Sequence, residues 1–221
     1  NRPIALWDCA SCPEMVILPA GSFTVGQERV TLETPIAVSR FEVMFDEWGA
    51  CAQGGGCRSN RSPSDQGWGR QRRPALSVSS HDTREFVDWL SQHTAHSYRL
   101  LTDVEWKYAA GAGTPTTVNG AGITSWWRPQ IGVPMANCVG CGSQWDGRQT
   151  APVGSFPANP FGVFDTAGNV TEWIENCPFA SCPVSAGAHG SSWFSAIDAW
   201  SAYPARYRGS EVGFRVARTL R

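Results

Sequence analysis

The sequence predicts an α+β protein with few helices, short strands and many ordered loops. Hydrophobic residues make up 42% of its 221 residues and tryptophan contributes 11, which is ample for a buried core. Charged residues reach only 17%, whereas glycine and proline number 23 and 15, a balance that favours turns over long helices. Neither a repeat nor a linker divides the chain. We therefore expect one domain over residues 1–221, with residues 1–12 as an N-terminal extension.

The first part of the chain predicts short strands and one short helix. Residues 15–23 form an apolar run that ends in a turn, which indicates a strand. Residues 30–32 and 36–43 predict a hairpin around residues 33–35. Residues 45–51 predict a short helix that the glycines at 54–56 stop.

Two further helices carry capping boxes. Ser79 with Asp82, and Thr102 with Glu105, are each a hydroxyl residue followed three positions later by an acidic residue. The second helix is expected to stop at Gly111. Four positions share one face of the first helix: Thr83, Phe86, Val87 and Leu90. Beyond residue 111 the pattern has almost no periodicity, so loops are expected there.

The charge and hydropathy patterns exclude several classes of partner. A net charge of −1 gives no electrostatic basis for binding nucleic acid or an anionic membrane surface. No apolar run reaches the roughly 18 residues that a membrane span needs. No signal peptide is visible, and a first residue Asn1 instead of Met is what removal of a leader would leave.

Cysteine spacing predicts disulfides. The eight cysteines fall into close pairs bracketed by turn residues, which favours four short-range bridges in an oxidising compartment. Zinc held by two CxxC units and reduced thiols are the alternatives. A redox role for CxxC is not favoured, because neither Cys9 nor Cys138 precedes a helical pattern. The expected pairs are Cys9 with Cys12, Cys51 with Cys57, Cys138 with Cys141, and Cys177 with Cys182.

The turn at residues 168–173 carries candidate metal ligands. Asn169 and Glu172, with the carbonyl groups of the turn, offer the hard oxygen ligands that calcium prefers. The alternative is a structural turn, in which Asn169 adopts a left-handed conformation and Glu172 caps backbone amides.

The order of motifs resembles the formylglycine-generating enzyme (sulfatase-modifying factor) family over residues 13–218. The resemblance implies a variant of the C-type lectin fold. The motifs that carry it are MVILPAGSF at 15–23, RP at 73–74, YRLLTDVEW at 98–106, APVGSF at 151–156, NPFGVFD at 159–165, GNVTEW at 168–173 and GFR at 213–215.

The resemblance also implies structural calcium. One family site matches Asn169, the carbonyl of Val170 and Glu172. The other resembles Asn137, the carbonyl of Cys138 and Asp146. The alternative is that these oxygens accept hydrogen bonds from loop amides.

The chain departs from the family where catalysis is expected. Family members oxidise a substrate cysteine with copper held by two cysteines between a Gly-Gly-Ser-Trp-like motif and the final Gly-Phe-Arg. The corresponding segment, from residue 190 to residue 215, contains no cysteine, and copper(I) prefers soft ligands. Neither copper nor formylglycine generation is therefore expected. The segment is also shorter than in the family, so the substrate groove is expected to differ.

The C-terminal segment is instead the expected binding surface. Aromatic residues and arginine dominate binding hot spots. The alternative is that some of these rings belong to the core. The candidates are Trp193, Phe194, Trp200, Tyr203, Arg206, Tyr207 and Arg208.

Together these features predict a periplasmic or secreted binding protein that recognises a protein or peptide partner, in an accessory or toxin-neutralising role. One alternative is an oxidoreductase with different chemistry, such as a siderophore-maturation oxidase. The other is a ligand-binding receptor diversified by a retroelement, because both kinds of protein occur among relatives of this fold.

Overall fold

The computed structural model describes residues 4–25, 28–58, 63–112, 134–175, 185–196 and 200–220. In these ranges the chain forms three helices and three sheets, which confirms the predicted α+β class. The largest sheet has the strand order β1 (Ala5–Leu6), β2 (Met15–Leu18), β5 (Ile36–Ser39), β11 (Val216–Thr219) and β6 (Tyr98–Leu100). The second has the order β10 (Val212–Phe214), β7 (Thr171–Trp173), β8 (Ser185–His189) and β9 (Trp200–Pro204). The third is a ribbon of β3 (Gly21–Val25) and β4 (Glu28–Leu32).

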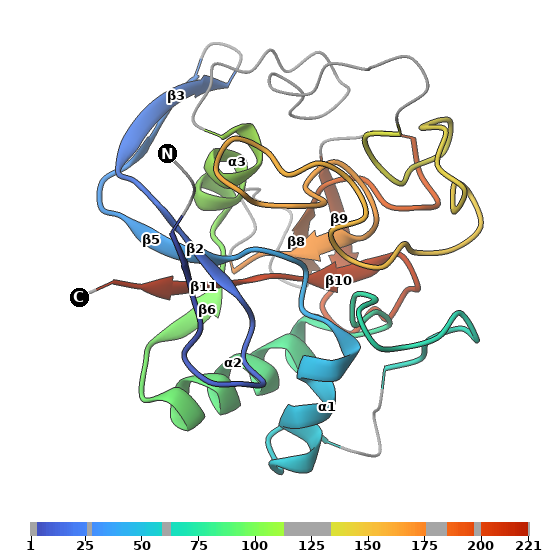
Figure 1. The fold of residues 1–221 in the computed structure, drawn as a ribbon, viewed down its shortest axis with the longest axis horizontal. Coiled ribbons are helices and arrows are strands. Elements are labelled where there is room, and N and C mark those ends of the chain that lie inside the picture. Colours follow the sequence, from blue (N-terminus) through green and yellow to red (C-terminus); the bar gives the residue numbers. More distant parts are fainter. Residues whose placement is uncertain are drawn as a thin grey trace.

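The helices form where the local sequence signals place them. They are α1 (Phe45–Gln53), α2 (Ser80–Thr94) and α3 (Asp103–Gly111). Ser79 and Thr102 accept the predicted N-terminal hydrogen bonds from the amides of Asp82 and Glu105. Gly111 is the last residue of α3 and not its stop, because the left-handed residue that ends the helix is Ala112. Figure 1 shows α1 and α2 together below the line of β10 and β11, with α3 above it.

The predicted hairpin around residues 33–35 is wrong. β4 pairs with β3, while β5 pairs with β2 and β11 in the five-stranded sheet. Residues 33–35 therefore carry the chain from one sheet to another instead of folding it back. Pro35, which has no amide hydrogen to donate, precedes β5 in this crossing.

The strands of the C-terminal part were not predicted. They are short, and β7 and β10 are buried along their whole length, so neither shows an alternating pattern. β10 runs parallel to β7, with Gly213 opposite Glu172. Only Arg215 separates β10 from β11, so the chain passes from the four-stranded to the five-stranded sheet at this residue.

The predicted disulfides form wherever the structure describes them. Cys9 bonds to Cys12, Cys51 to Cys57 and Cys138 to Cys141. The fourth predicted pair, Cys177 and Cys182, lies outside the described residues. None of the helices in the described ranges has the length and apolar character needed to cross a bilayer.

Candidate functional site

The buried guanidinium of Arg215 lies where the two large sheets meet. Its side chain is only 1% exposed. Nε and Nη2 donate to the two carboxylate oxygens of Glu172 at 2.7 and 2.6 Å. Nη1 and Nη2 also donate to the carbonyls of Ser39 and Phe164 at 3.1 and 3.0 Å. One side chain thus joins β7, the end of β5 and the loop before Asp165.

The point where Arg215 joins the two large sheets, called the junction below, also occupies the carboxylate of Glu172. Besides Arg215, the indole of Trp106 in α3 donates to its Oε2 at 2.7 Å. Burial alone would lower the pKa of Arg215, but the charge and hydrogen bonds of Glu172 outweigh it and leave that pKa raised. Both oxygens of this predicted calcium ligand therefore already accept hydrogen bonds.

Two further carboxylates lie close to this pair. Glu42 accepts hydrogen bonds from Asn169 Nδ2 at 2.8 Å and from the Val170 amide at 3.2 Å. Burial, followed by the charges of Asp165 and Glu172, raises the pKa of Glu42 well above its usual value. Burial likewise raises the pKa of Asp165 to about 6. Three buried carboxylates thus lie near the buried guanidinium of Arg215, and this arrangement favours binding of a proton or a cation.

One oxygen of Asp165 is buried without a hydrogen bond. Its Oδ2 accepts from the Gly154 amide at 2.7 Å, while Oδ1 has no partner. The residue borders a small pocket that Asn137, Thr166 and Asn169 also line. A buried oxygen left unsatisfied beside hard oxygen donors fits a cation such as calcium. Among the described residues, no three His, Cys, Asp or Glu side chains are arranged to hold a metal, so carbonyl and amide oxygens would complete the site.

The two predicted sets of calcium ligands contact each other through Asn137 and Asn169. The Asn169 amide donates to the Asn137 carbonyl at 2.8 Å, and Asn169 Oδ1 accepts from the Ala151 amide at 2.7 Å. The hydroxyl of Ser143 donates to Asn137 Oδ1 at 2.9 Å. These contacts fix both asparagines in the loop framework beside the pocket.

The remaining ligands of the second set bond to the loop itself. Asp146 accepts hydrogen bonds from the amides of Gly140 and Gly142 at 3.1 and 3.0 Å. The Cys138 carbonyl accepts from the Cys141 amide at 3.1 Å. Hydrogen bonds from loop amides to these oxygens are the alternative to a metal site that the sequence analysis considers. Sequence reasoning missed Glu42 and Asp165, although Asp165 closes one of the motifs that carry the family resemblance.

The predicted binding surface divides into buried and exposed members. Trp193 is 9% exposed, and its indole donates to the Ser210 carbonyl at 3.1 Å, so its ring belongs to the interior. Its neighbour Phe194 is 67% exposed and lies 5.3 Å from the Trp193 ring. Trp68 packs edge-on against the same indole at 5.0 Å. The side chain of Trp200 lies outside the described set.

Most of the other candidate binding residues of the C-terminal segment already contact side chains of the protein itself. The half-buried rings of Tyr203 and Tyr207 stack at 4.7 Å. A hydrogen bond to Glu211, followed by burial, raises the pKa of Tyr207 to about 12. Arg208 pairs with Asp82 at 2.5 Å and so holds the segment against α2. Arg206 is exposed.

A histidine and a carboxylate form a buried pair between β8 and α3. His189 Nε2 lies 2.5 Å from Asp103 Oδ1, and both residues are buried. The imidazole stacks on Trp106 with ring centroids 4.8 Å apart. Lys107 also reaches Asp103, at 2.8 Å. A His–Asp pair of this kind can orient an imidazole for acid–base chemistry, and it equally stabilises a buried imidazole.

The family described as the sulfatase-modifying factor enzyme 1-like domain matches residues 6–220. The chain belongs to this family. It is 35% identical over 112 residues to the formylglycine-generating enzyme of Mycobacterium tuberculosis, a match that covers 47% of this chain and 33% of that protein. It is 28% identical over 156 residues to the inactive C-alpha-formylglycine-generating enzyme 2 of Bos taurus, covering 66% and 48%. The chain thus spans about a third to a half of these relatives.

Among solved structures, the chain superposes on PvdO from Pseudomonas aeruginosa with a TM-score of 0.84 and 28% identity. That match covers 100% of both chains. The predicted fold of this family is therefore confirmed.

Replacing Glu172 tests the junction. We expect Glu172→Gln to lower the free energy of unfolding by about 3–5 kcal/mol, because it replaces the carboxylate that is hydrogen-bonded to the buried Arg215 with a neutral amide. Urea unfolding with a chelator present measures this without any contribution from metal. The control is Arg58→Ala, because Arg58 pairs with Glu85 at 3.0 Å but is 62% exposed, and we expect a loss below about 1 kcal/mol. Equal losses in the two variants would contradict a central role for the buried pair.

Proposed function

We propose that this protein is an exported binding module that recognises a protein or peptide through its C-terminal segment and does not generate formylglycine. The observation that carries the proposal is Phe194, an aromatic side chain that is 67% exposed while the Trp193 beneath it is buried. The Trp193 indole packs against the exposed ring, and Trp68 packs against the same indole. An exposed aromatic residue on a packed base is typical of a binding hot spot.

Val139 extends this apolar patch. It is 48% exposed, and its amide donates to the Ser195 carbonyl at 2.9 Å, so it lies beside the Phe194 turn. The Cys138–Cys141 disulfide and the bonds of Asp146 hold the loop that presents Val139. A patch held in place before binding loses little conformational entropy when a partner covers it.

The C-terminal segment lacks the cysteine ligands that hold copper in the enzymes of this family. The segment between Trp193 and Gly213 contains no cysteine. The cysteines in the described part of the chain are all in disulfides. Copper(I) requires soft ligands such as thiolates, so the family reaction has no metal site in this segment.

The disulfides of the protein support export, and an exported binding module suits an accessory role. Three disulfides in a chain of this size are typical of an oxidising compartment, so we place the protein in the periplasm or outside the cell. A binding module there suits an accessory or toxin-neutralising role. We also propose structural calcium beside Asp165, held by its unpartnered oxygen and by oxygens of the neighbouring loop.

A second candidate is an oxidoreductase with different chemistry, such as a siderophore-maturation oxidase. The buried pair of His189 and Asp103 and the full-length likeness to PvdO favour it. Metal analysis of the purified protein separates the two functions. Calcium alone supports the binding module, whereas stoichiometric copper or iron supports the oxidase.

The first prediction concerns the binding surface. We expect Phe194→Ala to weaken the affinity for a partner captured from the native source by at least about tenfold, because the ring is the exposed anchor of the patch. Titration calorimetry with the purified partner measures the change. Ile4→Ala is the matched control, because Ile4 is also 67% exposed but precedes β1 in the other sheet. Unchanged affinity in Phe194→Ala would remove this surface from the proposal.

The second prediction concerns calcium. We expect millimolar calcium, compared with chelator, to raise the thermal midpoint by about 5 °C, because the ion binds the folded state only. Asp165→Ala should abolish this shift, whatever its effect on the midpoint without calcium. Asp88→Asn, an exposed acidic position on α2, should keep it. A shift that persists in Asp165→Ala would place the ion elsewhere.

A further inference from the structure

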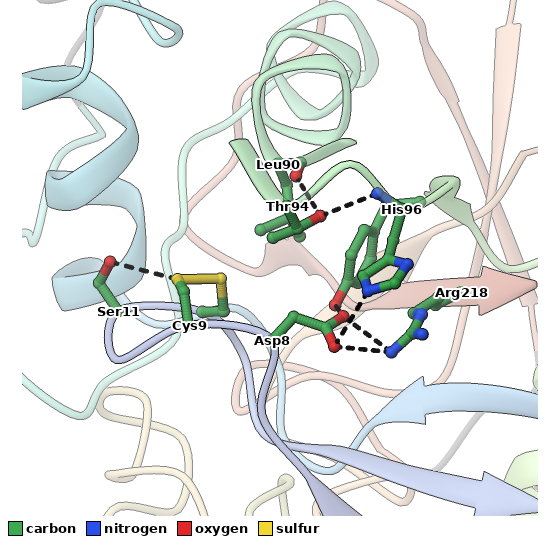
Figure 2. Close-up of a disulfide and its surroundings, with 9 residues drawn as sticks. Asp8, Cys9, Ser11, Leu90, Thr94, His96 and Arg218 are labelled. Carbon is green, nitrogen blue, oxygen red and sulfur yellow. Dashed lines mark hydrogen bonds and ion pairs between the residues drawn. A yellow bond between two sulfur atoms is a disulfide. The ribbon is translucent and has the colours of Figure 1, made fainter. Parts of the chain in front are cut away.

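The connection between β1 and β2 is closed by the Cys9–Cys12 disulfide (Figure 2). Cys12 is 4% exposed and belongs to the core, whereas Cys9 is half-buried at its edge. Ser11, which is exposed, places its hydroxyl 3.6 Å from Cys9 Sγ. Cys9 is therefore the sulfur that a thiol in solution reaches first, and Ser11 can donate a hydrogen bond to a thiolate there.

The neighbouring Asp8 anchors the same segment to the body of the protein. It accepts a hydrogen bond from Arg218 of β11 at 2.7 Å and another from the Tyr98 hydroxyl. His96 lies 3.7 Å from the same carboxylate. Figure 2 shows the Asp8 side chain pointing away from Cys9, toward Arg218 and His96. The positive charge of Arg218 thus lies against this carboxylate and reduces its repulsion of a negative charge on the sulfur.

β1 itself has few attachments. It pairs with β2 through two residues only, and the Ile17 amide adds one bond to the Ile4 carbonyl at 3.3 Å. Ile4 and Trp7 are 67% and 59% exposed, so these two side chains add little apolar burial. At this edge of the sheet, the disulfide and the Asp8 contacts therefore supply much of what holds β1 in place.

Although the local sequence does not favour a redox role for this CxxC unit, its position beside β1 leads us to propose that the Cys9–Cys12 disulfide is a thiol-exchange site whose reduction loosens β1 from the edge of the sheet. A thiolate of a small-molecule thiol attacks Cys9 Sγ, and the electron pair of the S–S bond leaves on Cys12 Sγ, which takes up a proton. A second thiolate attacks the external sulfur of the mixed disulfide and releases Cys9 as a thiolate, which is then protonated. In total the protein disulfide gains two electrons and two protons, and two thiols become one disulfide.

Reduction acts on β1 through chain entropy. The disulfide restricts the connection between Leu6 and Met15, which must reverse direction for β1 to pair with β2. Without the cross-link this connection samples more conformations, so closing it costs more entropy. The Asp8 contacts and the short β1–β2 pairing then hold the segment without the cross-link. The consequence is an exposed edge on β2, which is a template for pairing with another strand.

The first test is selective reduction of the native protein. Dithiothreitol is added without denaturant, free thiols are alkylated over time, and peptide mass spectrometry assigns them. The Cys51–Cys57 pair is the internal control, because these residues are 0% and 2% exposed. We expect Cys9 and Cys12 to be labelled at least about tenfold faster than this pair. Labelling of both pairs at the same rate would overturn the proposal.

The second test follows the strand itself. Hydrogen exchange at the Ile17 amide reports the bond to Ile4, and we expect exchange about tenfold faster after selective reduction. The Ala75 amide, bonded to the Val43 carbonyl at 2.7 Å, should not change. The Cys9→Ser/Cys12→Ser variant should reproduce the reduced protein. Unchanged Ile17 exchange in the reduced wild-type protein would show that the disulfide does not hold β1.

Discussion

A buried guanidinium without a partner is among the most costly groups a fold can contain, and Arg215 avoids that cost by binding Glu172 through two hydrogen bonds. The geometry of the surrounding structure follows from this requirement. Because Arg215 is the residue between β10 and β11, its fixed position sets where the chain leaves one sheet and enters the other. Its remaining donors satisfy the carbonyls of Ser39 and Phe164, which brings the end of β5 and the loop before Asp165 to the same point.

The same junction brings buried carboxylates close together. The guanidinium of Arg215 lies near Glu172, Glu42 and Asp165, and burial, followed for Glu42 by the charges of its carboxylate neighbours, raises the pKa values of Glu42 and Asp165. A proton or a cation offsets this buried negative charge, and the unpartnered oxygen of Asp165 gives a cation a place to bind. The Trp193 amide donates to the Asn169 carbonyl at 2.9 Å, so the turn that presents Phe194 is attached to this network through the backbone.

Local signals in the sequence predicted what local interactions decide. The capping boxes at Ser79 and Thr102 mark two helices because the residues that interact are three positions apart. Short cysteine spacings predicted three described disulfides for the same reason. The hairpin around residues 33–35 failed because strand pairing depends on partners far along the chain. Glu42 gave no signal either, since its hydrogen bond to Asn169 spans 127 positions. The sequence also could not predict that Trp193 is buried and Phe194 exposed. The two aromatic residues are adjacent, so only their tertiary contacts distinguish them.

The most direct measurement of the central claim is nuclear magnetic resonance of the Arg215 side chain. In the structure its Nε–H is buried and donates to Glu172 at 2.7 Å, so the proton can exchange with water only when the junction opens. We predict an Nε–H resonance that exchanges as slowly as the most protected backbone amides of β10 and β11. Arg206, which is exposed, provides the reference for fast exchange. An Arg215 signal that exchanges as fast as that of Arg206 would contradict the account, because it would show that the two sheets are not held together at this residue.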